Sequence, residues 1–179
     1  MSTGRTLRQT GGRVLLIAAL LGVMLFGGVG VSLAAPPAQG DEPGAALSER
    51  LELLYRREQN ASDALGFRLE RAHNLIDKMP DTLARLAEKG YDVSDLEAAL
   101  ATFETGVAEA EGYHQQAVDI LARHAGFDDS GTLTDREAAV DTLRSAGRAL
   151  RDAQFTLADA TVTLRRVILD WREANTLNS

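Results

Sequence analysis

Apolar residues recur at alternating steps of three and four positions through three long stretches of the chain, with polar residues between them. This spacing places apolar side chains on one face of an α-helix and is typical of a coiled-coil seam. No window combines the two-residue alternation of a β-strand with an excess of β-branched residues. The pattern therefore predicts an all-α protein.

The first stretch predicts a helix over residues 45–89. Its seam consists of Leu47, Leu51, Leu54, Glu58, Ala61, Leu65, Leu69, Ala72, Ile76, Met79, Leu83 and Leu86. Pro80 lacks a backbone donor and clashes with the carbonyl of Ile76, so we expect a kink there. Gly90 is expected to end the helix, because glycine adopts the left-handed conformation of a C-terminal cap without strain.

Two further stretches predict helices over 93–124 and 134–175. The second seam contains Val93, Leu96, Leu100, Phe103, Val107, Ala110, His114, Ala117, Leu121 and His124, and Gly126 is expected to end that helix. In the third helix, a stripe of Leu143, Leu150, Leu157, Leu164 and Trp171 runs beside Ala139, Ala146, Ala153, Ala160, Val167 and Ala174. Such a wide apolar face contacts two neighbours. Residues 45–177 are therefore expected to form an antiparallel three-helix coiled-coil bundle.

The N-terminal residues have the layout of a secretory signal. Residues 14–33 are almost entirely apolar, and the preceding segment holds three arginines and no acidic residue. The small residues Ser32 and Ala34 fit cleavage before Ala35, so residues 1–35 are interpreted as a signal peptide. An uncleaved membrane anchor is the alternative, because about 20 apolar residues can span a bilayer.

Either interpretation of the leader places the rest of the chain outside the cytoplasm, where it is secreted, periplasmic or on the cell surface. Contact with a membrane is expected only through residues 14–33, and only if they are not removed. Residues 36–44 hold three prolines and two glycines and are predicted to be an extended linker.

Composition narrows the possible functions. The chain has 179 residues with a net charge of -7, and every acidic residue lies after the leader. An acidic domain lacks the concentrated basic face that nucleic-acid binding needs, so no nucleic-acid partner is expected. The absence of cysteine excludes disulfides and thiolate chemistry. No phosphate-binding loop or nucleophile motif is present, and we therefore expect no enzymatic activity.

The segment after the second predicted helix resembles an EF-hand calcium loop. With Gly131 as the sixth residue of twelve, Asp128 and Ser130 take the third and fifth positions and Glu137 takes the twelfth. These positions supply oxygen ligands in EF-hands. The resemblance implies a weak calcium site formed by Asp128, Ser130, the Thr132 carbonyl and Glu137.

Two features weaken the calcium interpretation. The first position of the loop is Gly126, which has no side-chain oxygen. Thr134 and Glu137 also have the spacing of a capping box, which would make them the start of the third helix instead. No other cofactor is expected.

The predicted seams place several polar and small residues at contacts between helices. His114 and His124 lie ten residues apart, too far along a helix to share a metal ion, so hydrogen-bonded histidines are expected. Antiparallel pairing places His124 near Glu58. The same pairing places three glycines at one level, where they either open a pocket or leave room for aromatic rings: Gly66, Gly112 and Gly147.

Helix pairing also brings Trp171 close to Tyr91. Trp171 is then either a cover for the Gly90–Tyr91 turn or an exposed aromatic anchor for a partner. Taken together, the patterns predict an exported acidic helical bundle that serves as a structural or protein-interaction module of the cell envelope. Its partners would be other envelope proteins. The alternative is an extracytoplasmic chaperone or an ion-responsive sensor that uses the calcium-like loop.

Overall fold

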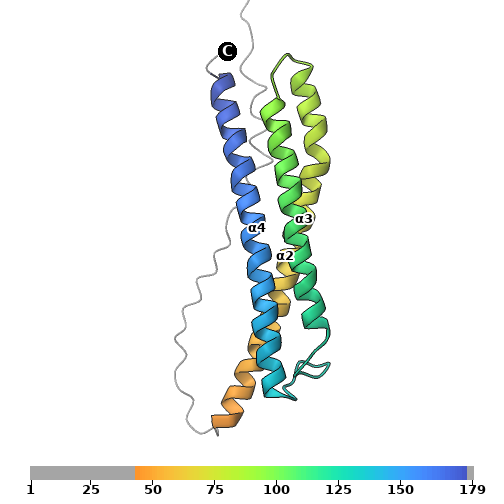
Figure 1. Ribbon diagram of the computed structural model, residues 1–179, viewed down its shortest axis with the longest axis vertical. Helices are drawn as coiled ribbons and strands as arrows, with labels where there is room; N and C mark the ends of the chain where they lie inside the picture. The colour runs from red at the N-terminus through yellow and green to blue at the C-terminus, as the bar shows by residue number, and fades with distance from the viewer. Residues whose placement is uncertain (1–42, 177–179) are drawn as a thin grey trace, which may run out of the picture. The chain divides into compact units, whose positions relative to one another are not determined.

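The computed structural model describes residues 43–176, and these form three α-helices. The helices are α2 (Pro43–Ala87), α3 (Ser94–Ala122) and α4 (Arg136–Thr176) (Figure 1). Strand-like pairing in the described residues is limited to one bridge between Phe127 and Leu133. The predicted all-α class is confirmed. The leader, residues 1–35, and most of the linker lie outside the described residues.

The three helices pack as a bundle in which α3 runs opposite to α2 and α4 (Figure 1). On the α2–α3 side, Ser62 meets His114 and the later residue His73 meets Glu111, which is earlier in α3. On the α3–α4 side, Trp171 near the end of α4 meets Asp92, which precedes α3. The chain therefore runs up, down and up again.

Small residues set the spacing of α3 and α4, which share the most extensive interface. A Cβ atom at Gly106 of α3 would lie 2.6 Å from the Ala160 Cβ of α4. The core side of α4 carries the predicted alanine stripe, and its members Ala139, Ala146, Ala153 and Ala160 are buried. Close approach of the two backbones brings larger core side chains of both helices into contact.

One part of the α2 seam differs from the prediction. Leu54 is exposed, and Tyr55 is buried with 1% of its surface accessible. The Tyr55 ring stacks on Phe127 at 4.1 Å between centroids, and its hydroxyl donates to the Leu121 carbonyl over 2.9 Å. An aromatic ring with a stacking partner and an internal acceptor buries more surface here than leucine would, so the helix turns Tyr55 inward.

The C-terminal end of α2 has the predicted glycine cap. Gly90 has a φ of +86°, and the Tyr91 N–H donates to the Leu86 carbonyl over 3.2 Å. The Gly90 N–H donates to the Ala87 carbonyl over 2.8 Å, which completes a Schellman motif. The helix continues through Pro80 without a break. None of the described helices is long and apolar enough to cross a membrane.

Placing an aspartate in the α4 core should destabilise the bundle strongly. Leu157 is only 7% exposed, so Leu157→Asp buries an unpaired carboxylate and should lower the free energy of unfolding by about 3 kcal/mol or more. Phe155 is 68% exposed on the same helix, and Phe155→Asp should change stability by less than about 0.5 kcal/mol. Chemical denaturation measures both. Equal losses in the two variants would mean that the buried face is misassigned.

Candidate functional site

The loop between α3 and α4 begins earlier than the sequence predicts. α3 ends at Ala122, and His124 adopts the left-handed conformation with a φ of +52°. The His124 N–H donates to the Leu121 carbonyl over 3.2 Å, and the Phe127 N–H donates to the His124 carbonyl over 2.7 Å. The prediction that Gly126 ends this helix is therefore wrong, because His124 makes the turn first.

The expected pairing of His124 with Glu58 is also wrong. Because His124 lies beyond the helix end, its ring packs edge-on against Tyr55, with 6.2 Å between centroids. Its Nδ1 lies 3.6 Å from a carboxylate oxygen of Asp129. Glu58 faces α4 instead, where its carboxylate would be 3.7 Å from a Cβ atom at Gly147.

Gly126 anchors the loop against the start of α4. It has a φ of +87°, and a Cβ atom there would lie 2.1 Å from the backbone nitrogen of Ala139. Only glycine permits this approach. The Gly126 carbonyl accepts hydrogen bonds from the N–H groups of Thr134 and Asp135 over 2.9 and 3.2 Å. Both ends of the loop are thereby tied together.

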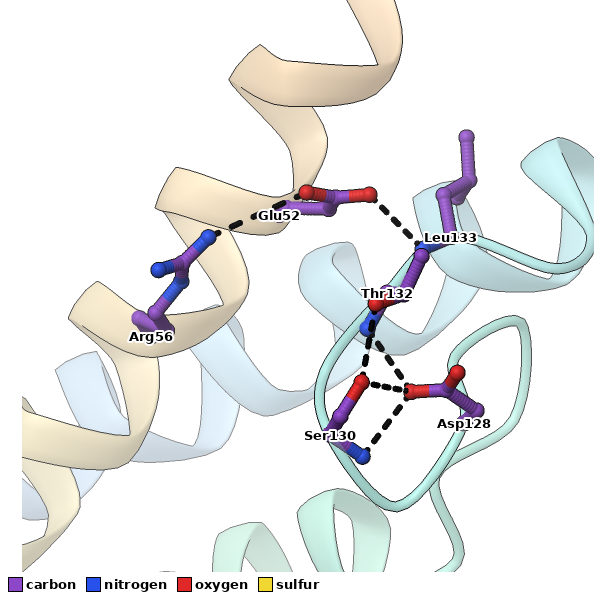
Figure 2. A network of polar contacts seen from close by, with 6 residues as sticks. All are labelled: Glu52, Arg56, Asp128, Ser130, Thr132 and Leu133. Atoms are coloured by element: carbon purple, nitrogen blue, oxygen red, sulfur yellow. Dashed lines mark hydrogen bonds and ion pairs between the residues drawn. The ribbon is translucent and has the colours of Figure 1, made fainter.

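Three residues that are predicted to bind calcium, Asp128, Ser130 and Thr132, lie together in the loop, and Figure 2 shows their side chains hydrogen-bonded to one another. The predicted ligand atom of Thr132 is its carbonyl oxygen, which accepts a hydrogen bond from the Asp128 N–H over 2.9 Å. One carboxylate oxygen of Asp128 accepts from the Ser130 hydroxyl over 2.6 Å and from the N–H groups of Ser130 and Thr132 over 2.8 and 2.9 Å. The Ser130 hydroxyl also lies 2.8 Å from the Thr132 hydroxyl. Hydrogen bonding, first from the Ser130 hydroxyl and then from the Thr132 N–H, lowers the pKa of Asp128.

The fourth predicted ligand, Glu137, lies in the first turn of α4. The carboxylate of Asp135 accepts from the N–H groups of Glu137 and Ala138 over 2.9 and 3.1 Å, so Asp135 caps α4. The predicted capping box of Thr134 and Glu137 is therefore wrong, because the bond from Thr134 to Gly126 keeps Thr134 in the loop. Within residues 43–176, no group of three or more His, Asp or Glu side chains is arranged to hold a metal ion.

A residue of α2 that the sequence analysis missed holds the loop from outside. Glu52 accepts a hydrogen bond from the Leu133 N–H over 3.0 Å, and its other carboxylate oxygen lies 3.8 Å from Arg56 (Figure 2). The bond joins positions 81 residues apart. No local pattern in the sequence indicates it.

Beneath the loop lies an apolar cluster that contains residues from all three helices. Gly131 passes over the Tyr55 ring, where a Cβ atom would be 3.6 Å from the ring carbon. Packed together there are Leu51, Tyr55, Leu121, Phe127, Ala139 and Ala146. The loop therefore closes this end of the bundle, and none of its buried side-chain nitrogen or oxygen atoms lacks a hydrogen-bond partner.

The two other histidines lie between α2 and α3. His114 donates through Nε2 to the Ser62 carbonyl over 3.0 Å, which confirms the expected hydrogen-bonded seam histidine. Its ring packs against Gly66, whose absent Cβ leaves the space for it. His73 contacts Glu111. A Cβ atom at Gly112 would have no packing neighbour within 4 Å. The three glycines therefore do not line one common space.

At the opposite end of the bundle, Trp171 packs over the turn between α2 and α3. Its indole N–H donates to the Asp92 carbonyl over 2.7 Å, and its ring meets Tyr91 edge-on with 5.7 Å between centroids. The structure therefore brings the two predicted interaction residues together as a cover for the turn. Both side chains stay partly exposed.

A row of exposed apolar side chains runs along the outer face of α4. Phe155, Val162 and Leu169 are 68%, 53% and 47% exposed and lie seven residues apart. We call these three residues the α4 outer row. The sequence analysis missed it because the core leucines repeat with the same period. A second search for seven-residue spacing outside the core stripes would have found it.

Comparison of the chain with protein-family models, curated proteins and solved structures finds no match in any of the three. The functional interpretation therefore depends on the residues of this chain alone.

Removing the charge of Glu58 should stabilise the protein at neutral pH. Burial raises the pKa of Glu58, while Arg57 and Arg151 act in the opposite direction with smaller effects. A raised folded-state pKa means that this carboxyl stabilises the fold when protonated and loses that contribution as pH rises through the folded-state pKa. Glu58→Gln should therefore melt at a higher temperature than the parent at about pH 7.

The difference between Glu58→Gln and the parent should vanish at about pH 3.5, where both side chains are neutral. Glu70→Gln is the matched control, because it removes the same charge from an exposed position on α2. Thermal melts across this pH range measure the effect. A Glu58→Gln variant that melts below the parent at neutral pH would show that the two arginines outweigh burial.

Proposed function

We propose that this protein is an exported coiled-coil bundle that serves as a structural or protein-interaction module of the cell envelope. The basic and then apolar pattern of residues 1–35 supports export. The acidic remainder of the chain fits a protein partner better than a nucleic-acid partner. The α4 outer row supports a role in protein contacts.

The α4 outer row is the observation that carries the proposal. Large apolar side chains gathered on one exposed face mark protein contact sites more often than scattered ones do. α4 cannot rotate to bury this row, because its opposite face already buries Leu150, Leu157 and Leu164. The exposed position of the row is thus a consequence of how the core packs.

The α4 outer row lies on a rigidly held helix, which favours the binding of a protein partner. The core side of α4 lies against α3 through small side chains, and its first turn is capped by Asp135. A surface held in place before binding loses little conformational entropy when a partner docks. The same rigidity suits a structural module.

Export and protein contact are tested separately on the full chain. A C-terminal reporter enzyme that needs disulfides for activity should be active, and removal of residues 2–35 should abolish that activity. A photo-crosslinking amino acid at position 162 should give adducts with envelope proteins, and the same group at the exposed α3 position 108 should not. An inactive reporter on the full chain would contradict export. Equal adducts at both positions would contradict a contact site on α4.

The alternative function is an extracytoplasmic chaperone or an ion-responsive sensor. The convergence of Asp128, Ser130 and Thr132 is the observation that favours a calcium response. Calcium would have to displace the three hydrogen bonds to one Asp128 oxygen, so any binding would be weak, at about 10⁻⁴ to 10⁻³ M.

We expect this loop to leave calcium unbound, because the Asp128, Ser130 and Thr132 side chains already bond to one another, and calcium should then leave the stability of the protein unchanged. We expect identical thermal melts in millimolar calcium and in EDTA, because the loop is already ordered by its internal hydrogen bonds. Glu137→Gln should behave as the parent does in both buffers. A melting temperature that rises with calcium in the parent and not in Glu137→Gln would favour the sensor over the envelope module.

A further inference from the structure

The α4 outer row separates two edges of opposite charge. At 100° per residue, Arg151, Ala158 and Arg165 lie on one side of the row, and Asp152 and Asp159 lie on the other. Apart from the half-buried Asp152, these edge residues are exposed. Arg166 is the exception, because it is a basic residue on the acidic edge.

We propose that a second copy of this chain docks on the α4 outer row with its α4 helix parallel to the first. This inference rests on the proposed function and names the partner in the protein contact. The two copies are related by a two-fold axis along the helices. Each side chain of the row then lies opposite its own equivalent, Phe155 on Phe155 and Val162 on Val162.

Charge complementarity selects the parallel orientation. A two-fold axis along the helices sets the basic edge of each copy against the acidic edge of the other. Arg151 then lies beside Asp152 of the second copy, and the uncharged Ala158 lies beside Asp159. Opposite charges that flank an apolar seam favour this pairing and set its orientation.

The antiparallel orientation is less favourable because it sets like edges against each other. In an antiparallel pair centred on Val162, Arg151 approaches Arg172 of the second copy and Asp152 approaches Glu173. Both contacts join like charges, and Asp159 with Arg166 is the one attractive pair. In the parallel orientation, Arg166 instead lies beside Arg165 of the second copy. Arg166 therefore distinguishes the two orientations.

The direction of α2 agrees with parallel docking. α2 and α4 run in the same direction, so both copies of α2 begin at the same end of a parallel pair (Figure 1). Forty-two residues precede Pro43, and they include the apolar segment 14–33. If the leader is kept as a membrane anchor, two chains that leave one membrane in the same direction meet this requirement, and an antiparallel pair does not.

The small size of the row predicts a weak dimer. Three apolar side chains per copy bury less surface than the roughly 1,200 Å² at the lower limit of stable interfaces. An uncleaved leader would confine the chains to one membrane, which would raise their effective concentration and favour the pairing.

The absence of cysteine makes disulfide crosslinking a direct test. Single variants Val162→Cys and Leu169→Cys of the full chain, expressed in membranes and exposed to a mild oxidant, should both give covalent dimers. Ala108→Cys, on the exposed face of α3, is the control and should not. In an antiparallel pair centred on Val162, Leu169 would face Phe155, so Leu169→Cys alone would give no dimer.

Charge changes supply the second measurement. In the Val162→Cys background, Arg166→Glu should increase the dimer yield by about threefold or more, because it completes the acidic edge. Asp159→Arg should decrease it by a similar factor. Both substitutions change exposed residues, and they should change the dimer yield in opposite directions. Altered folding would not explain both results.

Two results would overturn the inference. A dimer yield from Val162→Cys no higher than that from Ala108→Cys would show that no second copy docks on this row. Dimers from Val162→Cys without dimers from Leu169→Cys would show an antiparallel pair. Either result leaves the proposed function standing if the export reporter is active and photo-crosslinks at position 162 reach other proteins.

Discussion

At Gly106, α3 lies so close to α4 that any side chain would meet the Ala160 methyl group. Small residues at this interface allow the larger side chains of both helices to share one core. They also fix the rotation of α4, which determines which residues face outward. The exposed row of Phe155, Val162 and Leu169 and the charged edges beside it follow from that rotation.

Much of the fold could be predicted from periodicity. Alternating three- and four-residue steps located the helices, and the Gly90 cap followed from the demand for a left-handed residue. The burial of Tyr55 could not be predicted from periodicity, because it depends on stacking with Phe127, which is distant in the sequence. A helical repeat indicates which face of a helix is apolar, but it does not indicate which aromatic rings stack on each other.

The loop between α3 and α4 shows that the sequence predicts the candidate site only in part. The turn residues Asp128 and Ser130 were identified from spacing, and the structure does bring them together with Thr132. The cap at Asp135 was missed because the choice between Thr134 and Asp135 depends on the bond from Thr134 to Gly126. Glu52 was missed because its contact with Leu133 spans 81 residues. Long-range partners decide such details, and a local motif carries no information about them.

The odd number of helices in the bundle has a mechanical consequence. Because α2 and α4 run in the same direction, the start of α2 and the end of α4 lie at opposite ends of the bundle (Figure 1). The 41 residues of α4 span about 60 Å at 1.5 Å per residue. A bundle of this kind acts as a spacer, because it holds Pro43 and Thr176 at opposite ends. A two- or four-helix bundle would return the chain to its starting point.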